Sequence, residues 1–327
     1  MPRSATPKSA APISAKPKSG TGSSTHSGTK SRAKPGTKSA ATKSATSKPA
    51  TFTPAEPPAA SITRTPVHVG IGGWTFEPWR GAFYPAGLPH AKELSYAASH
   101  LTSIEINGTF YRTQTPATFR KWGSEVPDGF LFSVKGPRYV THRRDLKEAR
   151  ESIDRFLNSG VTELGDRLGP LLWQFPPTKK FDEADFANFL ELLPRDFDGT
   201  PLRHVVEVRH ASFCVPDFVA LLRKFKTAVV FSEHKTYPAI ADVTGDFLYL
   251  RLQKGDDSIA TCYRDADIAA WADRVRGWLS GKEPSDLPRI EATTAKVKPR
   301  DIFVYFIHEG KVRAPAGAMA LIEKLRS

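Results

Sequence analysis

The stretch LTSIEINGTFYRT, residues 101–113, contains the alternation on which the fold prediction depends. Its first half reads as a β-strand, because apolar and polar side chains alternate along it and successive side chains of a strand point to opposite faces. Glu105 and Asn107 then share one face, and isoleucines occupy the other. This face is either exposed to solvent or part of a site, and the rest of the chain has to decide between the two.

The same stretch also contains a hairpin signal. Asn107-Gly108 between two alternating runs is typical of a two-residue β-turn. A tight hairpin would leave no crossover segment before the next strand, whereas the helical pattern that begins at Pro116 supplies one. We therefore predict a strand that continues through a helical crossover into a parallel neighbour.

Strand and helix patterns alternate along the chain from about residue 66. Eight segments are predicted as strands: His68–Gly72, Ser103–Asn107, Phe130–Lys135, Pro170–Phe175, His204–Arg209, Ala228–Glu233, Phe247–Gln253 and Ile302–Phe306. Helical patterns cover 90–101, 116–126, 145–159, 182–193, 216–225, 266–279 and 315–325. This order favours an α/β fold, a (β/α)8 TIM-like barrel, over residues 66–327. An open doubly wound sheet is the rival, but GIGG at 70–73 lacks its G-x-G-x-x-G phosphate turn.

Residues 1–65 differ in composition from the rest. The whole chain has a formal net charge of +13, and residues 1–60 contain ten Lys or Arg and one acidic residue, Glu56. Lys, Ser, Thr, Ala and Pro dominate this segment, and such a composition buries too little apolar surface to offset chain entropy. We predict a disordered basic tail. It is either a solvated extension or an electrostatic arm, residues 1–60, for nucleic acid or another polyanion.

Several functional classes are disfavoured by composition. The two cysteines, Cys214 and Cys262, form no metal-binding spacing and fit a reducing compartment, so we expect a cytoplasmic protein. No run of about 18 apolar residues exists, so no membrane association is expected. No apolar segment of the secretory type follows the first methionine. The oligomeric state is left open.

Polar side chains recur at the carboxyl ends of the predicted strands, while the strand bodies are apolar. In a barrel these ends converge on one mouth, where active sites form. The residues are Glu105, Asn107, Lys135, Gln174, Glu207, Arg209, Glu233, Arg251 and Gln253. Two interpretations stay open and can coexist. One is a structural ion network, such as Glu105 with Arg251 and Glu207 with Arg209, and the other is a ligand site.

Several segments of the chain are similar to one known family. GIGGW at 70–74, IEINGTFYRTQTPATFRKW at 104–122, FLFSVKGPRYVTH at 130–142, LGPLLWQFPP at 168–177, VVEVRHASF at 205–213 and DFLYLRL at 246–252 occur in the same order as in the YecE-like family, the domain of unknown function 72. The resemblance runs from about residue 67 to the C-terminus. It implies a TIM-like barrel and no particular activity, since none is securely established for the family.

The chain also departs from the pattern of that family. Gly72 stands where the family usually has a small hydroxyl residue or Ala. Gln253 stands where a His is usual, with one residue inserted before Gly255. His308 follows a motif that has lost its first Asn. If those positions act in catalysis elsewhere in the family, the chemistry of this member is altered.

The expected mouth combines carboxylates with cations and amides. We predict Glu105, Glu207 and His210 as catalytic groups. We predict Trp74, Asn107, Tyr111, Arg112, Lys135, Gln174, Arg209 and Arg251 as substrate-binding groups. Arginine forks suit carboxylate or phosphate, so the leading hypothesis is an enzyme for a small anionic substrate with hydrolase or lyase chemistry.

Other chemistries are weighed against this one. No dinucleotide fingerprint is present, so no redox cofactor is predicted. A divalent metal could draw on Glu105, Glu207, Glu233, His234 and His308, but no compact ligand motif supports it. Glycoside hydrolysis also uses paired carboxylates. The cluster of Trp74, Trp79, Phe83 and Tyr84 is either hydrophobic packing or a stacking surface. The non-enzyme alternative is a nucleic-acid or polyanion binder that uses the tail.

Overall fold

A closed barrel of eight parallel strands forms the centre of the protein. A computed structural model describes residues 67–291 and 298–327. Its strands are β1 (Val67–Gly72), β2 (Ser103–Ile106), β3 (Leu131–Lys135), β4 (Leu168–Gln174), β7 (His204–Glu207), β8 (Ala228–Glu233), β9 (Phe247–Lys254) and β10 (Asp301–Glu309). They pair in the order β1-β10-β9-β8-β7-β4-β3-β2, and β2 pairs with β1 to close the ring. All eight predicted strands are present, and the TIM-like barrel is confirmed. The predicted tail, residues 1–65, lies outside the described residues.

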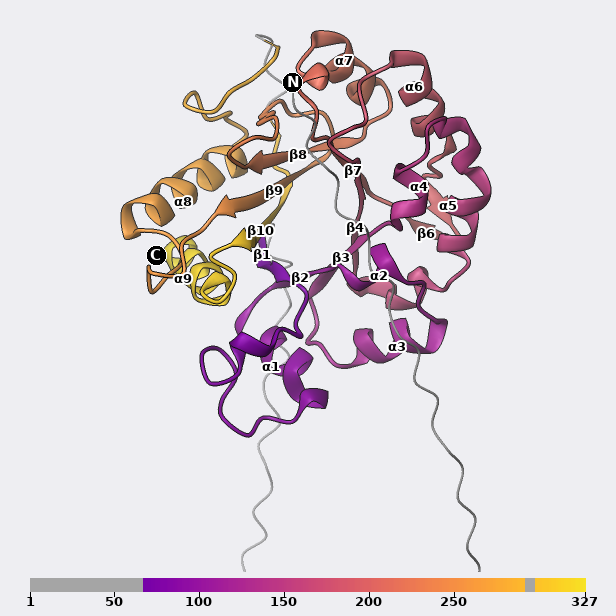
Figure 1. Ribbon diagram of the computed structural model, residues 1–327. Helices are drawn as coiled ribbons and strands as arrows, with labels where there is room; N and C mark the ends of the chain where they lie inside the picture. The colour runs from indigo at the N-terminus through magenta and orange to yellow at the C-terminus, as the bar shows by residue number, and fades with distance from the viewer. Residues whose placement is uncertain (1–66, 292–297) are drawn as a thin grey trace, which may run out of the picture. The chain divides into compact units, whose positions relative to one another are not determined.

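Helices connect most of the strands on the outer side of the ring (Figure 1). They are α1 (Glu93–His100), α2 (Gly108–Tyr111), α3 (Pro116–Ser124), α4 (Arg138–Thr141), α5 (Arg150–Leu157), α6 (Glu183–Leu192), α7 (Pro216–Lys224), α8 (Asp265–Leu279) and α9 (Ala314–Arg326). Five short 3-10 helices complete the described part: Glu77–Trp79, His90–Lys92, Leu146–Ala149, Val161–Arg167 and Ala211–Phe213. The last helix, α9, packs against β1, β10 and α8, so the C-terminal helix covers the seam between the first and last strands.

Local sequence signals account for where the helices begin. Asp182 accepts a hydrogen bond from the amide of Asp185 at 2.9 Å, which confirms Asp182 as the N-cap of α6. Thr115 caps α3 in the same way and is followed by Pro116, whose missing N–H costs nothing in the first turn. Asn107 adopts a right-handed helical conformation at the start of α2 and forms no hairpin, so the crossover interpretation of Asn107-Gly108 is confirmed.

Two features of the connections differ from the prediction, and a third, the connection between β8 and β9, follows it. The short helices α2 and α4 were not expected, because four residues are too few to show helical periodicity. A small antiparallel pair, β5 (Asp196–Phe197) and β6 (Thr200–Pro201), lies between α6 and β7. Between β8 and β9, the described chain crosses through residues 234–246 without a helix or strand.

The barrel separates two apolar regions. Side chains on the outer face of the strands, such as Ile104, Val206 and Leu250, pack with the helices in one large cluster. A second cluster fills the interior: Leu131, Leu172, Val205, Ala228, Val230, Phe247, Tyr249, Phe303, Tyr305 and Ile307. Each fully buried large apolar side chain contributes about 1.5–3 kcal/mol, so the two clusters hold the polar mouth in a rigid frame.

The strand register places polar side chains together at the carboxyl end of the interior. Glu105 pairs with Gly72 on one side and Ser133 on the other, and Gln174 pairs with Glu207. Arg251 on β9 pairs with Tyr305 on β10. The strands therefore place a polar cluster above the apolar interior. Among the described residues, no helix has both the length and the apolar character that a membrane crossing requires.

Candidate functional site

Arg251 links two carboxylates across the interior of the barrel. Its Nη1 donates to Glu207 Oε2 at 2.5 Å, and its Nη2 donates to Glu105 Oε1 at 3.0 Å. All three side chains are almost completely buried. Burial alone would lower the pKa of Arg251, but the two carboxylates outweigh burial and raise it. A buried cation between two anions satisfies charges that would each cost several kcal/mol if left alone. The predicted ion network exists.

The second oxygen of Glu105 is also occupied. Tyr249 donates its hydroxyl to Glu105 Oε2 at 2.7 Å, and Ser133 Oγ lies 2.8 Å from the same hydroxyl. Burial, followed by the charge of Glu105, raises the pKa of Tyr249 well above its usual value. Tyr249 is therefore a neutral donor, and both oxygens of Glu105 are held by buried partners.

Arg209 forms the second half of the network, just past the end of β7. Its Nε and Nη2 both donate to Glu207 Oε1 at 3.1 Å, and Nη2 donates to Gln174 Oε1 at 2.7 Å. The guanidinium carbon lies 4.5 Å from the ring centre of Tyr237. Burial by itself would raise the pKa of Glu207, but Arg251 and Arg209 overcome this and lower it. Glu207 is thus an ionised carboxylate with a cation on each oxygen.

Two cations of the mouth lack such pairing among the described residues, the exposed Lys311 and the buried Lys135. The side chain of Lys135 extends from the end of β3 and is only 6 % exposed. Its Nζ lies 4.1 Å from the ring centre of Phe110, and among the described residues the ammonium has no hydrogen-bond or ion-pair partner. Burial, followed by the charge of Arg251, lowers the pKa of Lys135 to about 8. Thr109 fixes the backbone by donating to the Lys135 carbonyl at 2.7 Å.

A cavity of about 500 Å³ opens above this cluster. Its lining comprises Gly72, Trp79, Asn107, Tyr111, Lys135, Gln174, Arg209, Arg251, Gln253, Phe306, Ile307, His308 and Lys311. Glu105 and Glu207 are not among these residues, because they lie beneath the arginines that they hold. The amide of Gln253 is buried, and neither its oxygen nor its nitrogen has a hydrogen-bond partner in the described structure. The cavity therefore presents a free amide and a free amine.

The structure places the other predicted site residues in two groups. Asn107 and Tyr111 line the cavity, and Tyr111 is 71 % exposed at its edge. Three others lie outside the lining. His210 caps the 3-10 helix Ala211–Phe213 by accepting from the Ser212 amide at 3.1 Å. Arg112 is exposed at the end of α2, and Trp74 packs edge-on against Trp122.

Sequence reasoning left seven lining residues out of the predicted site: Gly72, Trp79, Gln253, Phe306, Ile307, His308 and Lys311. Gln253 was noted as a polar residue at a strand end, His308 as a possible metal ligand, and both as departures from the family pattern. His308 has a φ of +75° beside a register shift in β10, which turns the chain at the rim. Trp79 donates its indole N–H to the Lys311 carbonyl at 2.8 Å, which joins the first and last connections. The contact between Trp79 and Lys311 has no local sequence signal, because it spans 232 positions.

The early aromatic cluster mainly forms packing. The rings of Trp79, Phe83 and Tyr84 meet edge-on or tilted, and Trp79 and Tyr84 are almost completely buried. Tyr84 donates its hydroxyl to the Trp74 carbonyl at 2.6 Å. Of the four aromatics, Trp79 alone is part of the cavity lining.

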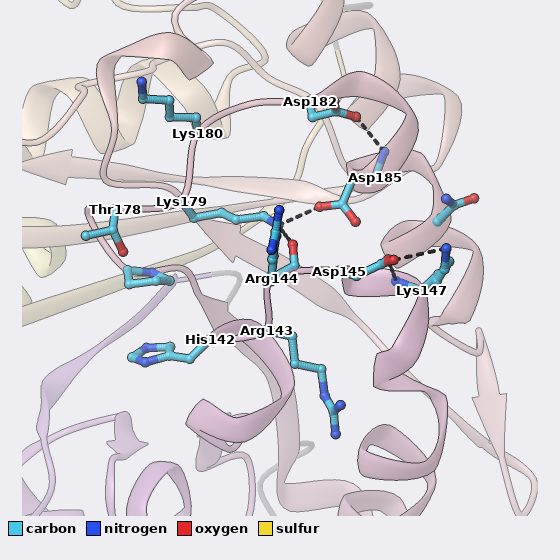
Figure 2. A pocket seen from close by; sticks show the side chains of 12 residues that line it. His142, Arg143, Arg144, Asp145, Lys147, Thr178, Lys179, Lys180, Asp182 and Asp185 are labelled. Carbon is cyan, nitrogen blue, oxygen red and sulfur yellow. Dashed lines mark hydrogen bonds and ion pairs between the residues drawn. The ribbon is translucent and has the colours of Figure 1, made fainter.

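A larger hollow of about 700 Å³ lies on the connections that follow β3 and β4 (Figure 2). Some of its charges pair with one another. Lys179 Nζ contacts Asp185 Oδ2 at 2.5 Å and the Arg144 carbonyl at 2.9 Å, as the dashed lines in Figure 2 show. Lys147 pairs with Asp145 at 3.0 Å. The side chains of Arg144 and Lys180 have no ion-pair partner among the described residues. Because this hollow lies on surface connections and not over the buried polar cluster of the barrel, the smaller mouth cavity is the better candidate site.

The donor set gives no support to a metal centre. Within residues 67–291 and 298–327, no three His, Cys, Asp or Glu side chains lie close enough together to share an ion. His234 instead stacks on Tyr237 at 3.8 Å and lies 5.5 Å from the ring of His308. Glu233 accepts from the Tyr263 hydroxyl at 2.6 Å. These candidate ligands have other partners.

The barrel and the polar cluster at the carboxyl ends of its strands place the protein among TIM-type barrel proteins, in which the site lies at the mouth formed by these ends. The family model for the protein of unknown function DUF72 matches residues 68–327, and the chain belongs to this family. The UPF0759 protein YunF of Bacillus subtilis (strain 168) is 32 % identical over 169 residues, which are 50 % of this chain and 57 % of YunF. The match thus spans less than two thirds of that relative.

Solved structures show the same fold. A DUF72 family protein from Thermotoga maritima MSB8 is 24 % identical, with a TM-score of 0.60 over 80 % of this chain and 99 % of the other. A DUF72 family protein from Enterococcus faecalis V583 is 17 % identical, with a TM-score of 0.56 over 80 % of this chain and 98 % of the other. The resemblance to the family that the sequence motifs indicated is confirmed.

Proposed function

We propose that this protein is an enzyme that binds a small anionic substrate, bearing phosphate or carboxylate, in the mouth cavity and acts by hydrolase- or lyase-type chemistry. One observation supports this most strongly. Four cationic side chains line the cavity, namely Lys135, Arg209, Arg251 and Lys311, and the lining contains no carboxylate. The buried Glu105 and Glu207 neutralise the two arginines from below, so Lys135 and Lys311 leave the cavity with an excess of positive charge.

Each group then has a part in binding. Arg209 is held by Glu207 and Gln174 through Nε and Nη2, which leaves the N–H groups of Nη1 as the charged donors available to an anion. The free amide of Gln253 offers a donor and an acceptor to a neutral part of the substrate.

The buried carboxylates remain candidate catalytic groups. In the empty site, Glu207 Oε1 is occupied by Arg209. A substrate anion that attracts Arg209 would weaken this contact and free one oxygen of Glu207 for proton transfer. Glu105 is held more firmly, by Arg251 and Tyr249, so Glu207 is the better candidate general base or acid.

A ligand panel tests the proposal. Phosphate esters, carboxylates and neutral sugars are titrated against the full chain by calorimetry, and hits are assayed for turnover. Arg209→Gln and Lys311→Gln are expected to weaken binding of anionic hits at least about tenfold, the loss typical of one charge-assisted contact. Arg144→Gln in the second hollow is the matched control and leaves binding unchanged. Equal binding in all three variants, or hits confined to neutral sugars, would contradict the proposal.

The basic segment supports a second candidate function, binding of nucleic acid or another polyanion. Residues 1–60 contain ten basic residues and one acidic residue. Phosphate contacts made by lysines weaken with salt. The full chain and a chain that begins at residue 61 are compared for binding to mixed nucleic acid at two salt concentrations. Salt-sensitive binding by the full chain alone supports this function, and no binding by either contradicts it.

A further inference from the structure

The environment of Lys135 differs from that of the neighbouring cations. Arg251 has two carboxylate partners and Arg209 has one, all within 3.1 Å. Lys135 lines the same cavity and is almost as deeply buried as Arg251, yet its Nζ faces the ring of Phe110 and has no polar partner among the described residues. A lysine that served only as a positive charge would be stabilised by an ion pair with a carboxylate. Here the nearby carboxylates pair with the arginines and not with Lys135.

The surroundings favour the uncharged amine of Lys135. Arg251 on β9 and Arg209 after β7 act against its charge, while the carboxylates Glu105 and Glu207 act in favour of it and are outweighed once burial is included. The pKa of His142, which follows α4, is lowered chiefly by burial, and the positive charge of Lys135 contributes to this lowering. A desolvated lysine beside other cations is an activated nucleophile, because the neutral amine carries the reactive lone pair.

We propose that Lys135 is a covalent nucleophile that forms an imine with a small aldehyde or ketone bearing a phosphate or carboxylate group. This inference rests on the proposed function, because the lining cations would hold the anionic group of the same molecule. Of the two proposed reaction types, hydrolase and lyase, this inference favours the lyase type. A protonated imine withdraws electrons from the neighbouring carbon–carbon bond and so favours its cleavage.

The step balances without a cofactor. The lone pair of Lys135 Nζ attacks the carbonyl carbon, a C–N bond forms, and the carbonyl oxygen takes a proton from the attacking nitrogen to give a carbinolamine. A second proton, taken from solvent, converts the hydroxyl into water, which leaves as the C=N bond forms, so the net change is amine plus carbonyl plus one proton giving protonated imine plus water. The unpaired amide of Gln253 lines the same cavity and supplies a donor for the oxygen during these steps.

Trapping with a small probe tests this proposal. Glyoxylate, an aldehyde with a carboxylate, is incubated with the full chain and sodium cyanoborohydride, which reduces an imine to a stable carboxymethyl-lysine, and peptide mass spectrometry reports each lysine separately. Lys135 is expected to react at least about tenfold faster at pH 7 than Lys121 and Lys147, which are 64 % and 66 % exposed, because far more of it is neutral. The trapping rate of Lys135 levels off above pH about 8, whereas that of Lys147, whose pKa is raised by Asp145, keeps rising.

Two further measurements separate this proposal from the one it rests on. Inorganic phosphate, whose binding is measured by calorimetry on the same protein, is expected to slow trapping at Lys135 and not at Lys121. Lys135→Arg keeps the charge and is expected to retain phosphate binding while the adduct at this position disappears. Phosphate binding with no preferential trapping at Lys135 overturns the nucleophile and leaves the proposed function standing. Trapping that phosphate does not affect, or neither binding nor trapping, overturns both.

Discussion

Arg251 Nη2 lies 3.0 Å from Glu105 Oε1, although the two residues are 146 positions apart in the chain. The contact joins β9 to β2 across the barrel, and the other end of the same guanidinium holds Glu207 on β7. One side chain thus connects three strands at the level where the cavity begins. Its removal affects stability and the cavity at once, which makes it a suitable first test of the structure.

Replacement of Arg251 by Met is expected to lower the free energy of unfolding by about 3–5 kcal/mol, because the carboxylates of Glu105 and Glu207 would stay buried without their shared cation. Denaturant unfolding followed by circular dichroism measures the change. Arg155→Ala removes an exposed i,i+4 pair with Glu151 and is expected to stay within about 0.5 kcal/mol of the unchanged protein. A loss below about 1 kcal/mol for Arg251→Met would contradict the network.

Stability is expected to fall in acid through Glu207. Its pKa in the folded protein lies below its ordinary value of 4.5, so the unfolded chain takes up the proton first. The contribution of Glu207 is therefore fully present above about pH 5 and is lost as the pH falls through and below the ordinary value. Unfolding free energies measured between pH 6 and 3 should decline less steeply in Glu207→Gln. Parallel slopes in the two proteins would argue against an ion-paired Glu207.

Replacement of Lys135 by Met is expected to stabilise the protein by about 1–3 kcal/mol at pH 7, since the folded state holds this ammonium without a partner. The folded pKa of about 8 lies below the ordinary 10.5, so the unfolded chain binds more protons between these values and stability rises with pH there. The advantage of the variant should shrink as the pH is raised from 8 to 10. Lys121→Met, at an exposed position, serves as the control and should show no such trend.

Gly72→Ala tests how tightly the mouth is packed. A Cβ at residue 72 would lie 2.9 Å from Asn107 Nδ2 and 3.0 Å from Ile307 Cγ2, so both lining side chains must shift. We expect anionic ligands to bind several-fold more weakly, with little change in the fold. Gly277→Ala, in α8 with open space around its Cβ, should instead stabilise the helix by about 0.5–1 kcal/mol and leave binding unchanged. Undiminished binding in Gly72→Ala would show that Asn107 does not contact the ligand.

Most of the fold could be predicted from period-two alternation. The strands that contain Glu105 and Glu207 were located because a polar side chain on the inner face lies between apolar side chains on the outer face. In a parallel barrel these polar side chains converge at one end. Strand ends were less accurate. β7 stops at Glu207, and β10 continues to Glu309 through a register shift that no local pattern reveals.

The candidate site was only partly predictable. Arg209 follows the end of β7, Lys135 is the last residue of β3 and Arg251 lies in the carboxyl half of β9, and all three were found by these positions. Sequence could not show that Glu105 and Glu207 would lie beneath the arginines rather than in the cavity, because depth depends on side-chain lengths across the barrel. The indole N–H of Trp79 donates to the backbone carbonyl of Lys311, 232 positions away in the chain. The alternation of apolar and polar residues gives no sign of such a contact. His210 also follows a strand, but its ring satisfies a local turn instead.

The crossover at residues 234–246 has a consequence for how such proteins diverge. Tyr237 covers the guanidinium of Arg209 from this segment, which in the described chain belongs to no helix and no strand. Insertions or deletions in this segment would change the surface that covers Arg209 without disturbing the pairing of β8 with β9. We therefore expect relatives that bind different ligands to differ in the length of this segment. We expect them to retain Arg251, because its guanidinium bridges carboxylates on two other strands.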